Sequence, residues 1–430
     1  MSASGIAPRR RASPAVLLAV IGAPAAMITG ILFSRPDVVA VGLPLALWAV
    51  LATTSRTDGD DVTVQVRSTT VEDEGRLVDD ILIRSDAEMV EVAVIQAERT
   101  RRRAFVPGTT RLRAVTRPQH SGPMTTVEAA VRTIDTDAAV LGAPQAPVIA
   151  IRAVRPVARR LPRLPLAPRL TGLHGAHEGS RPGQGGDFRD IHPFAPGDEL
   201  RRVDWKATAR AARRPGELLI RRTNNLSDAS AVIVMDTADD LGEVVATWGS
   251  GDLSRSGVTS LDHARSAARS LAEATIGQGD RVAFHTLAHG GRSVRSGSGR
   301  RHLARLVAEI SASGRAGDDT RFRRTPPVPH GSIIYVLSTF FDGAAAEIAM
   351  RWRASGHRVV AVDVLPALDT VRLSTERDLA LQVLQAERHD MLHQLREAGV
   401  DTVRWSDDGD AGLTALARTG GPQAARGMRR

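Results

Sequence analysis

The sequence contains no cysteine, and this absence excludes several classes of protein. Without cysteine there is no disulfide framework, no thiolate zinc site and no cysteine nucleophile. The absence of disulfides neither requires nor excludes an oxidising compartment. The 430 residues are 42% hydrophobic, which is enough to bury a sizeable core. This length predicts roughly two to three domains.

Lysine is nearly absent as well, because Lys206 is the only one in the chain. The 57 basic residues are therefore almost all arginine, and they exceed the 48 acidic residues to give a net charge of +9. This excess is dilute and acidic residues lie throughout the chain, so we expect no specific nucleic acid partner. An arginine-rich polyanion-binding protein is an alternative, and it predicts binding that weakens steeply with salt.

Common catalytic motifs are also missing. The chain has no Gly-x-Ser-x-Gly elbow, no His-Glu-x-x-His motif and no phosphate-binding loop. We therefore expect that the protein is not an enzyme and has no catalytic residues. A membrane-associated metal-dependent hydrolase is an alternative, and it would need a bound ion and a nearby base to activate water.

Two apolar stretches near the N-terminus predict membrane helices. Residues 14–33 and 38–54 carry no charge, and about 20 apolar residues span a bilayer as a helix. We predict two transmembrane helices within residues 1–57. The alternative is a signal peptide, with Arg9 to Arg11 before the apolar run and Ala23-Pro24-Ala25 as a small-residue cleavage site. A signal peptide would explain only the first stretch.

The same arginine cluster favours a cytoplasmic N-terminus. Two spans then return the chain to the cytoplasm, so everything from Arg56 onward is expected on that side. The predicted location is the cell membrane, with a multi-pass topology and the lipid bilayer as a partner.

Residues 58–158 predict a small β-sandwich domain. Segments rich in β-branched residues, separated by acidic and Gly-Pro punctuation, lie at 62–66, 77–83, 90–95, 125–131 and 148–154. The basic run 98–103 is interpreted as a solvated hairpin edge, with contact to lipid headgroups as the alternative. A proline-rich, extended linker at 159–169 opens the next region, 159–228.

From residue 229 to 408, apolar strands alternate with amphipathic helices. Strands are expected at 231–235, 281–286, 332–337, 358–364 and 402–405, and helices at 261–275, 301–311, 344–355 and 379–398. This alternation predicts an α/β domain with a doubly wound sheet. Residues 409–430, whose end is rich in glycine and arginine, are predicted to be a disordered tail.

Between residues 171 and 223, charges, glycines and aromatic residues are tightly interleaved. The runs are Gly183-Gln184-Gly185-Gly186-Asp187-Phe188-Arg189-Asp190, Pro196-Gly197-Asp198, and Arg201-Arg202-Val203-Asp204-Trp205-Lys206-Ala207-Thr208-Ala209-Arg210. We expect the charges to form a network around Trp205 and Phe188. The residues predicted to form a docking or structural core are Gly186, Phe188, Gly197, Asp198, Arg201, Asp204, Trp205 and Arg210.

Histidines in the same region raise the alternative of a zinc site. His174 and His177 have the spacing of ligands on one helix face, but the glycines around them oppose a helix. No carboxylate or thiolate stands at metal-site spacing beside them. We interpret these two residues and His192 as structural histidines.

These runs resemble the signature of the DUF58 family: a Gly-rich entry, an acidic-Phe pair, a Gly-Asp turn and an Arg-x-x-Asp-Trp core. Asp187 and the Ile191-His192 pair depart from the residues more usual there. The resemblance implies a von Willebrand A-like α/β domain, preceded by a transmembrane hairpin and a β-domain. It also implies a scaffold or adaptor that works with a MoxR-like AAA+ ATPase in remodelling or maturation of an unknown client protein.

A metal corner is the second implication of this resemblance. In von Willebrand A domains an Asp-x-Ser-x-Ser loop, a distant Thr and a distant Asp hold Mg²⁺, whereas this chain has Asp236-Thr237-Ala238-Asp239-Asp240. Ala238 offers no oxygen, so the site looks degenerate. The residues predicted to hold Mg²⁺ are Asp236, Asp240, Thr320 and Asp342. The alternative is that Asp236 caps a helix or binds neighbouring backbone amides.

Overall fold

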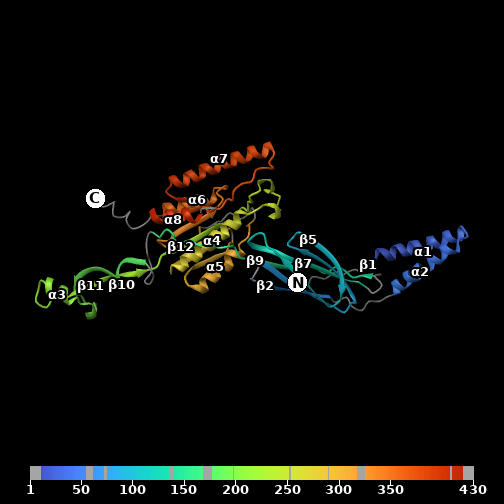
Figure 1. The fold of residues 1–430 in the computed structure, drawn as a ribbon, viewed down its shortest axis with the longest axis horizontal. Coiled ribbons are helices and arrows are strands. Elements are labelled where there is room, and N and C mark those ends of the chain that lie inside the picture. The colour runs from blue at the N-terminus through green and yellow to red at the C-terminus, as the bar shows by residue number, and fades with distance from the viewer. Residues whose placement is uncertain are drawn as a thin grey trace, which may run out of the picture. The chain divides into compact units, whose positions relative to one another are not determined.

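The computed structural model describes residues 11–54, 62–71, 75–134, 140–167, 177–196, 198–250, 253–288, 290–316, 325–406 and 409–419. The chain divides into two compact units (Figure 1). Unit 1 consists of Met1–Gln119 and Met124–Arg152, and unit 2 consists of His120–Pro123 and Ala153–Arg430.

Unit 1 begins with an apolar helix pair, α1 (Pro14–Leu32) and α2 (Pro36–Thr54). The Ser13 side chain accepts a hydrogen bond from the Ala15 amide, and Pro14 fits the first helical position because its missing N–H would be unpaired there anyway. The helices pack against each other through Val16, Trp48 and Ala52. Gly30 permits the close approach, because a Cβ there would collide with Val39.

The outer surfaces of both helices are apolar. Large exposed side chains include Leu18, Ile21, Ile31, Val41 and Leu47. A helix that is hydrophobic all round is usually buried in protein or lipid. Of the described helices, α1 is long and apolar enough to cross a membrane, and Pro36–Ala52 is a shorter apolar helix.

The rest of unit 1 is built from two antiparallel sheets. One has the order β1-β8-β7-β4-β5, with β9 paired to β7, and the other has the order β2-β3-β6. Both sheets contribute to one core, in which Ile81 and Ile83 meet Val90, Val92 and Val127. The strands are β1 (Arg11–Ala12), β2 (Val62–Val71), β3 (Arg76–Ser85), β4 (Met89–Gln96), β5 (Thr100–Pro107), β6 (Thr110–Thr116), β7 (Gly122–Ile134), β8 (Val140–Leu141) and β9 (Val148–Val154).

All five segments expected to be strands lie in this set, whereas β5 and β6 were not expected. Both are rich in arginine, and β5 is exposed along most of its length, whereas Leu112 and Ala114 of β6 pack on the core. β5 is the exposed edge strand of its sheet, and Ala97 and Glu98 adopt positive φ at the β4–β5 turn. The run 98–103 is therefore part of a hairpin at a sheet edge.

Unit 2 contains a six-stranded sheet with the order β14-β13-β12-β15-β16-β17. All pairings are parallel except that of β14 with β13, and the strand order reverses between β12 and β15. The strands are β12 (Ser230–Asp236), β13 (Arg281–Leu287), β14 (Ser293–Gly297), β15 (Ile333–Ser338), β16 (Arg358–Asp363) and β17 (Asp401–Arg404).

Helices cover both faces of this sheet, so it is doubly wound. Leu271, Leu306 and Leu413 bury one face through α4 (Ser260–Gly277), α5 (Arg300–Ala312) and α8 (Gly409–Thr419). Ile348 and Leu395 bury the other through α6 (Ala344–Ala354) and α7 (Thr375–Glu397). The predicted strands and helices agree with these elements to within a few residues. The closer likeness to a von Willebrand A domain stays a prediction.

Two segments differ from their prediction. The tail predicted to be disordered from residue 409 begins with helix α8, because Leu413 and Leu416 are spaced to pack together on the sheet. In the proline-rich linker, Leu161, Leu164 and Ala167 are buried in the core of unit 2. The linker is therefore part of the α/β core, and unit 2 already begins at Ala153.

A long hairpin in unit 2 forms a two-stranded sheet of its own. It consists of β10 (His177–Pro193), η2 (Leu200–Arg202), α3 (Trp205–Ala211) and β11 (Leu219–Ser227), and we call it the signature hairpin. Figure 1 shows the two strands in green with α3 at their end.

Candidate functional site

The signature hairpin holds most of the residues predicted to form a docking core. Its strands pair antiparallel, with His192 opposite Ile220. Val203, Leu219 and Ile220 form its small buried centre. An isolated two-stranded hairpin is marginally stable in water, so the capping contacts at its end are important for its shape.

The acidic residues of the hairpin act mainly as backbone caps. Asp198 Oδ2 accepts a hydrogen bond from the Ala195 amide at 2.8 Å. Asp204 Oδ1 accepts one from the Ala207 amide at 2.9 Å and caps α3. Such caps satisfy amide groups that a turn or helix leaves unpaired.

The predicted charge network around Trp205 is therefore corrected. At the hairpin tip, Glu199 forms ion pairs with Arg201 at 2.6 Å and with Arg202 at 3.4 Å. The hydrogen bond from Arg201 lowers the pKa of Glu199 below its ordinary value. Arg210 lies in the last turn of α3, where its charge suits the helix dipole.

Large apolar side chains of the hairpin face solvent instead of a core. Phe188 is 52% exposed, Leu200 65% and Trp205 67%. Ile191 and Phe194 are exposed as well. The guanidinium of Arg221 lies 5.4 Å from the ring centre of Phe188.

A hollow of about 530 Å³ lies beside Trp205. Three guanidinium groups and an indole surround it, a combination suited to carboxylates and to apolar groups. Its lining residues are Arg201, Arg202, Val203, Asp204, Trp205, Arg221 and Thr223. The hollow thus contains three of the predicted docking residues, and sequence reasoning missed Arg221 because it comes from the second strand.

The other predicted residues of this region lie apart or outside the described ranges. Gly186 lies within β10. Gly197 and His174 fall outside the described residues. His192 Nδ1 lies 2.7 Å from the carbonyl oxygen of Pro193.

The predicted metal corner lies at the carboxyl end of β12. Asp236 accepts hydrogen bonds from the Ser338 hydroxyl at 2.7 Å and from the Ala238 amide at 3.1 Å. Burial raises the pKa of Asp236 to about 6, and the nearby Asp342 and Asp239 act in the same direction. Sequence reasoning missed Ser338 as a partner because it ends a different strand, β15.

The predicted magnesium ligands do not form one cluster among the described residues. Asp240 accepts a hydrogen bond from the Leu261 amide at 3.4 Å, and burial raises its pKa. Asp342 binds the Ala344 amide at 3.1 Å at the start of α6, and Thr320 lies outside the described residues. No group of three His, Cys, Asp or Glu side chains suited to a metal ion occurs in the described part of the chain.

Asp236 accepts two hydrogen bonds from the protein, and the magnesium site stays a prediction because its ligand Thr320 lies outside the described residues. The amide contact of Asp236 agrees with the alternative that it binds neighbouring backbone. Close by, Arg388 forms an ion pair with Asp363 and donates to the Thr339 carbonyl at 2.6 Å.

An unexpected cluster lies at the start of α4. His120 Nδ1 is 2.7 Å from Asp262 Oδ2, and His120 Nε2 is 2.9 Å from the Leu253 carbonyl oxygen. Both partners are acceptors, so the ring satisfies both only when it is protonated on both nitrogens. The hydrogen bond with Asp262 accordingly raises the pKa of His120. Burial alone would raise the pKa of Asp262, but hydrogen bonds from His120 and Ser121 lower it.

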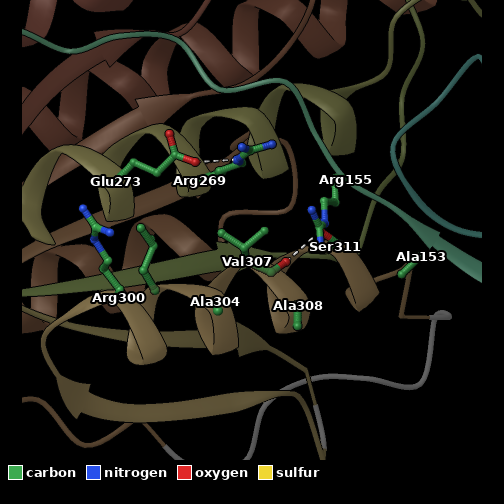
Figure 2. A pocket seen from close by; sticks show the side chains of 10 residues that line it. Ala153, Arg155, Arg269, Glu273, Arg300, Ala304, Val307, Ala308 and Ser311 are labelled. Carbon is green, nitrogen blue, oxygen red and sulfur yellow. Dashed lines mark hydrogen bonds and ion pairs between the residues drawn. The ribbon is translucent and has the colours of Figure 1, made fainter. Parts of the chain in front are cut away.

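A second hollow, of about 430 Å³, lies between α4 and α5 (Figure 2). Arg269 forms an ion pair with Glu273 at 2.7 Å and also donates to the Pro156 carbonyl. Figure 2 shows Ala304, Val307 and Ala308 on the α5 side, with Arg155 opposite. Among the described residues, three arginines and one acid line each of the two hollows, so their linings have the same charge balance.

A family model described as "Protein of unknown function DUF58" matches residues 190–389. This match supports assignment of the chain to the DUF58 family. The DUF58 match begins within β10 and ends within α7, so it includes the tip of the signature hairpin and the metal corner. None of the curated proteins searched matches the chain.

Proposed function

We propose that this DUF58 protein is a membrane-anchored adaptor that binds partner proteins through its signature hairpin and performs no chemistry itself. The observation that carries the proposal is the exposure of Phe188, Leu200 and Trp205 on a hairpin with its own small core. Aromatic residues are enriched at the centres of protein interfaces. Their exposure here is therefore better explained by binding than by folding.

The anchor in this proposal is the pair α1 and α2. Their apolar outer surfaces favour lipid, and α1 is long enough to span a bilayer. Two spans and the N-terminal arginines would leave both ends of the α1–α2 pair on the cytoplasmic side. The protein would then be a multi-pass cell-membrane protein with its soluble parts in the cytoplasm.

The proposed partner is a MoxR-like AAA+ ATPase, as family resemblance implies, together with a client protein that the two remodel or mature. The doubly wound sheet supports a von Willebrand A-like domain in this role. The alternative of a metal-dependent hydrolase has less support, because the described residues offer no three-ligand metal group.

Affinity capture tests this proposal directly. The tagged protein is captured in mild detergent with and without Mg²⁺ and ATP, and co-purifying proteins are identified by mass spectrometry. We expect a MoxR-like ATPase with the wild type and strongly reduced recovery with the double variant Leu200→Ser, Trp205→Ser. The matched control is Val371→Ser, because Val371 is 88% exposed but lies outside the hairpin. Equal recovery of the ATPase with all three proteins would overturn docking through the hairpin.

A further inference from the structure

The hollow beside Trp205 also indicates what kind of segment the hairpin recognises. Resting on the proposed docking function, we propose that this hollow is a carboxylate-binding site for an acidic segment of a partner protein. Arg202 and Arg221 would bind the carboxylate, and Trp205 would pack against an apolar neighbour in the same segment.

The first argument is that the acidic side chains at the hairpin tip already have hydrogen bonds or ion pairs within the hairpin. Asp198 and Asp204 accept backbone amides, and Glu199 pairs with Arg201 and Arg202. Glu217 accepts hydrogen bonds from the amides of Arg213 and Arg214 at 2.6 and 3.2 Å. Three of these acids are therefore engaged by backbone amides, and Glu199 is the one that pairs with arginines of the hollow.

The second argument is the imbalance of charge in the hollow itself. Among the described residues, three arginines line it, and Asp204 is the one acidic lining residue. Two of the arginines share the single carboxylate of Glu199, and the third, Arg221, lies over Phe188. A guanidinium binds a carboxylate through two parallel hydrogen bonds, which makes this group the expected ligand.

The shape of the site favours a protein segment over a lipid surface. A concave space of about 530 Å³ accepts one or two side chains, whereas a bilayer presents a broad face. The exposed Leu200 and Trp205 supply the apolar contact that an acidic and apolar peptide would match.

Peptide binding to the full-length protein in phosphatidylcholine nanodiscs tests the proposal. The probe is a short fluorescein-labelled peptide of Glu and Leu, and its neutral counterpart contains Gln in place of Glu. Fluorescence anisotropy should show tighter binding of the Glu peptide, weakened by salt. Arg202→Gln and Arg221→Gln should each weaken it about tenfold, equivalent to about 1.4 kcal/mol, while Arg202→Lys should retain part of the affinity.

The matched control is Arg351→Gln, because Arg351 is an exposed arginine on α6 paired with Glu347. It should leave binding unchanged, and circular dichroism should show that all variants are folded. Equal binding of the Glu and Gln peptides, or unchanged affinity in both glutamine variants, would overturn the proposal. Binding to vesicles containing phosphatidylglycerol, lost in the same variants, without peptide binding would assign the site to lipid instead.

This experiment is separable from the test of docking. If Trp205→Ser abolishes recovery of the ATPase while Arg202→Gln and Arg221→Gln retain it, the hairpin docks a partner but does not recognise carboxylates. If all of these variants retain the ATPase, the docking function itself is wrong.

Discussion

The α/β sheet and the signature hairpin of unit 2 use large apolar residues in opposite ways. In the sheet, Phe284 and Trp405 are fully buried and contribute to one continuous core. In the hairpin, Phe188 and Trp205 are more than half exposed. The sheet therefore uses its aromatic residues for its own stability, whereas those of the hairpin are available to a partner.

The two regions also use their acids differently. Asp236 at the sheet edge is held by a side chain from another strand, Ser338. Asp204 in the hairpin binds an amide only three residues away. Long-range contacts stabilise the sheet, and short-range contacts shape the hairpin. The following predictions test this difference, from the largest expected effect to the smallest.

Phe284→Ala should lower the free energy of unfolding of the α/β domain by about 3–5 kcal/mol, because it leaves a cavity in a closed core. Urea unfolding of the detergent-solubilised protein, followed by circular dichroism, measures the change. A loss below about 1 kcal/mol would contradict the contrast between the two regions.

Asp236→Asn should stabilise the protein at neutral pH. The raised pKa of about 6, against an ordinary value of 3.8, means that the folded state binds the proton more tightly than the unfolded state. Wild-type stability therefore falls as pH rises from about 4 to 6, and it is constant above this window. One pKa unit corresponds to about 1.4 kcal/mol, so the variant should gain at most about 3 kcal/mol.

Unfolding curves at several pH values check this prediction. The difference in free energy of unfolding between the variant and the wild type should vanish near pH 4, and this pH serves as the internal control. A variant less stable than the wild type at neutral pH would show that ionised Asp236 is stabilised by a contact beyond Ser338 and Ala238.

His120→Gln should remove a pH-dependent contribution of about 1.5–3 kcal/mol, the usual range for hydrogen bonds to charged groups. Because its pKa is raised, His120 stabilises the fold fully below its ordinary pKa of 6.5. That stabilisation is lost as pH rises through the higher folded value. Stability of wild type and variant should therefore differ at pH 6 and converge at alkaline pH. The exposed His393, paired with Glu397 on α7, provides a control variant, His393→Gln.

Asp204→Ala should cost about 1 kcal/mol, because it removes the N-cap of α3. The effect should be local to the hairpin tip. Hydrogen exchange should show faster exchange of the Ala207 amide and unchanged protection in β12. Equal loss of protection in both places would mean that the hairpin and the sheet unfold together.

Trp205→Ser should change the free energy of unfolding by less than about 0.5 kcal/mol, as is usual for exposed positions. The same variant is expected to lose partner binding, so its effect separates stability from function. A cost comparable to Phe284→Ala would show that Trp205 is part of a core.

Much of the α/β domain could be predicted from sequence because its elements carry strong local patterns. The strands are continuous apolar runs, and α4 begins with a Thr259 and Asp262 capping box. In contrast, β5 was missed because an exposed edge strand needs no apolar alternation, and β6 because its arginines alternate with only two apolar core residues, Leu112 and Ala114. Helix α8 was missed because a glycine-rich neighbourhood hides the two leucines that pack on the sheet.

The sequence by itself determined the apolar helix pair, the family resemblance, and the order of strands and helices in the α/β domain apart from β14 and α8, because each depends on residues close together in the chain. Only the tertiary structure decided which charges meet. It brings His120 to Asp262 and Asp236 to Ser338, residues that lie far apart in the sequence and share no local pattern. It also assigns Asp198 and Asp204 to backbone amides, because a turn and a helix start leave N–H groups unpaired within reach of a short side chain. The arginines beside Trp205 come from both halves of the hairpin, and only the folded chain brings them to one hollow.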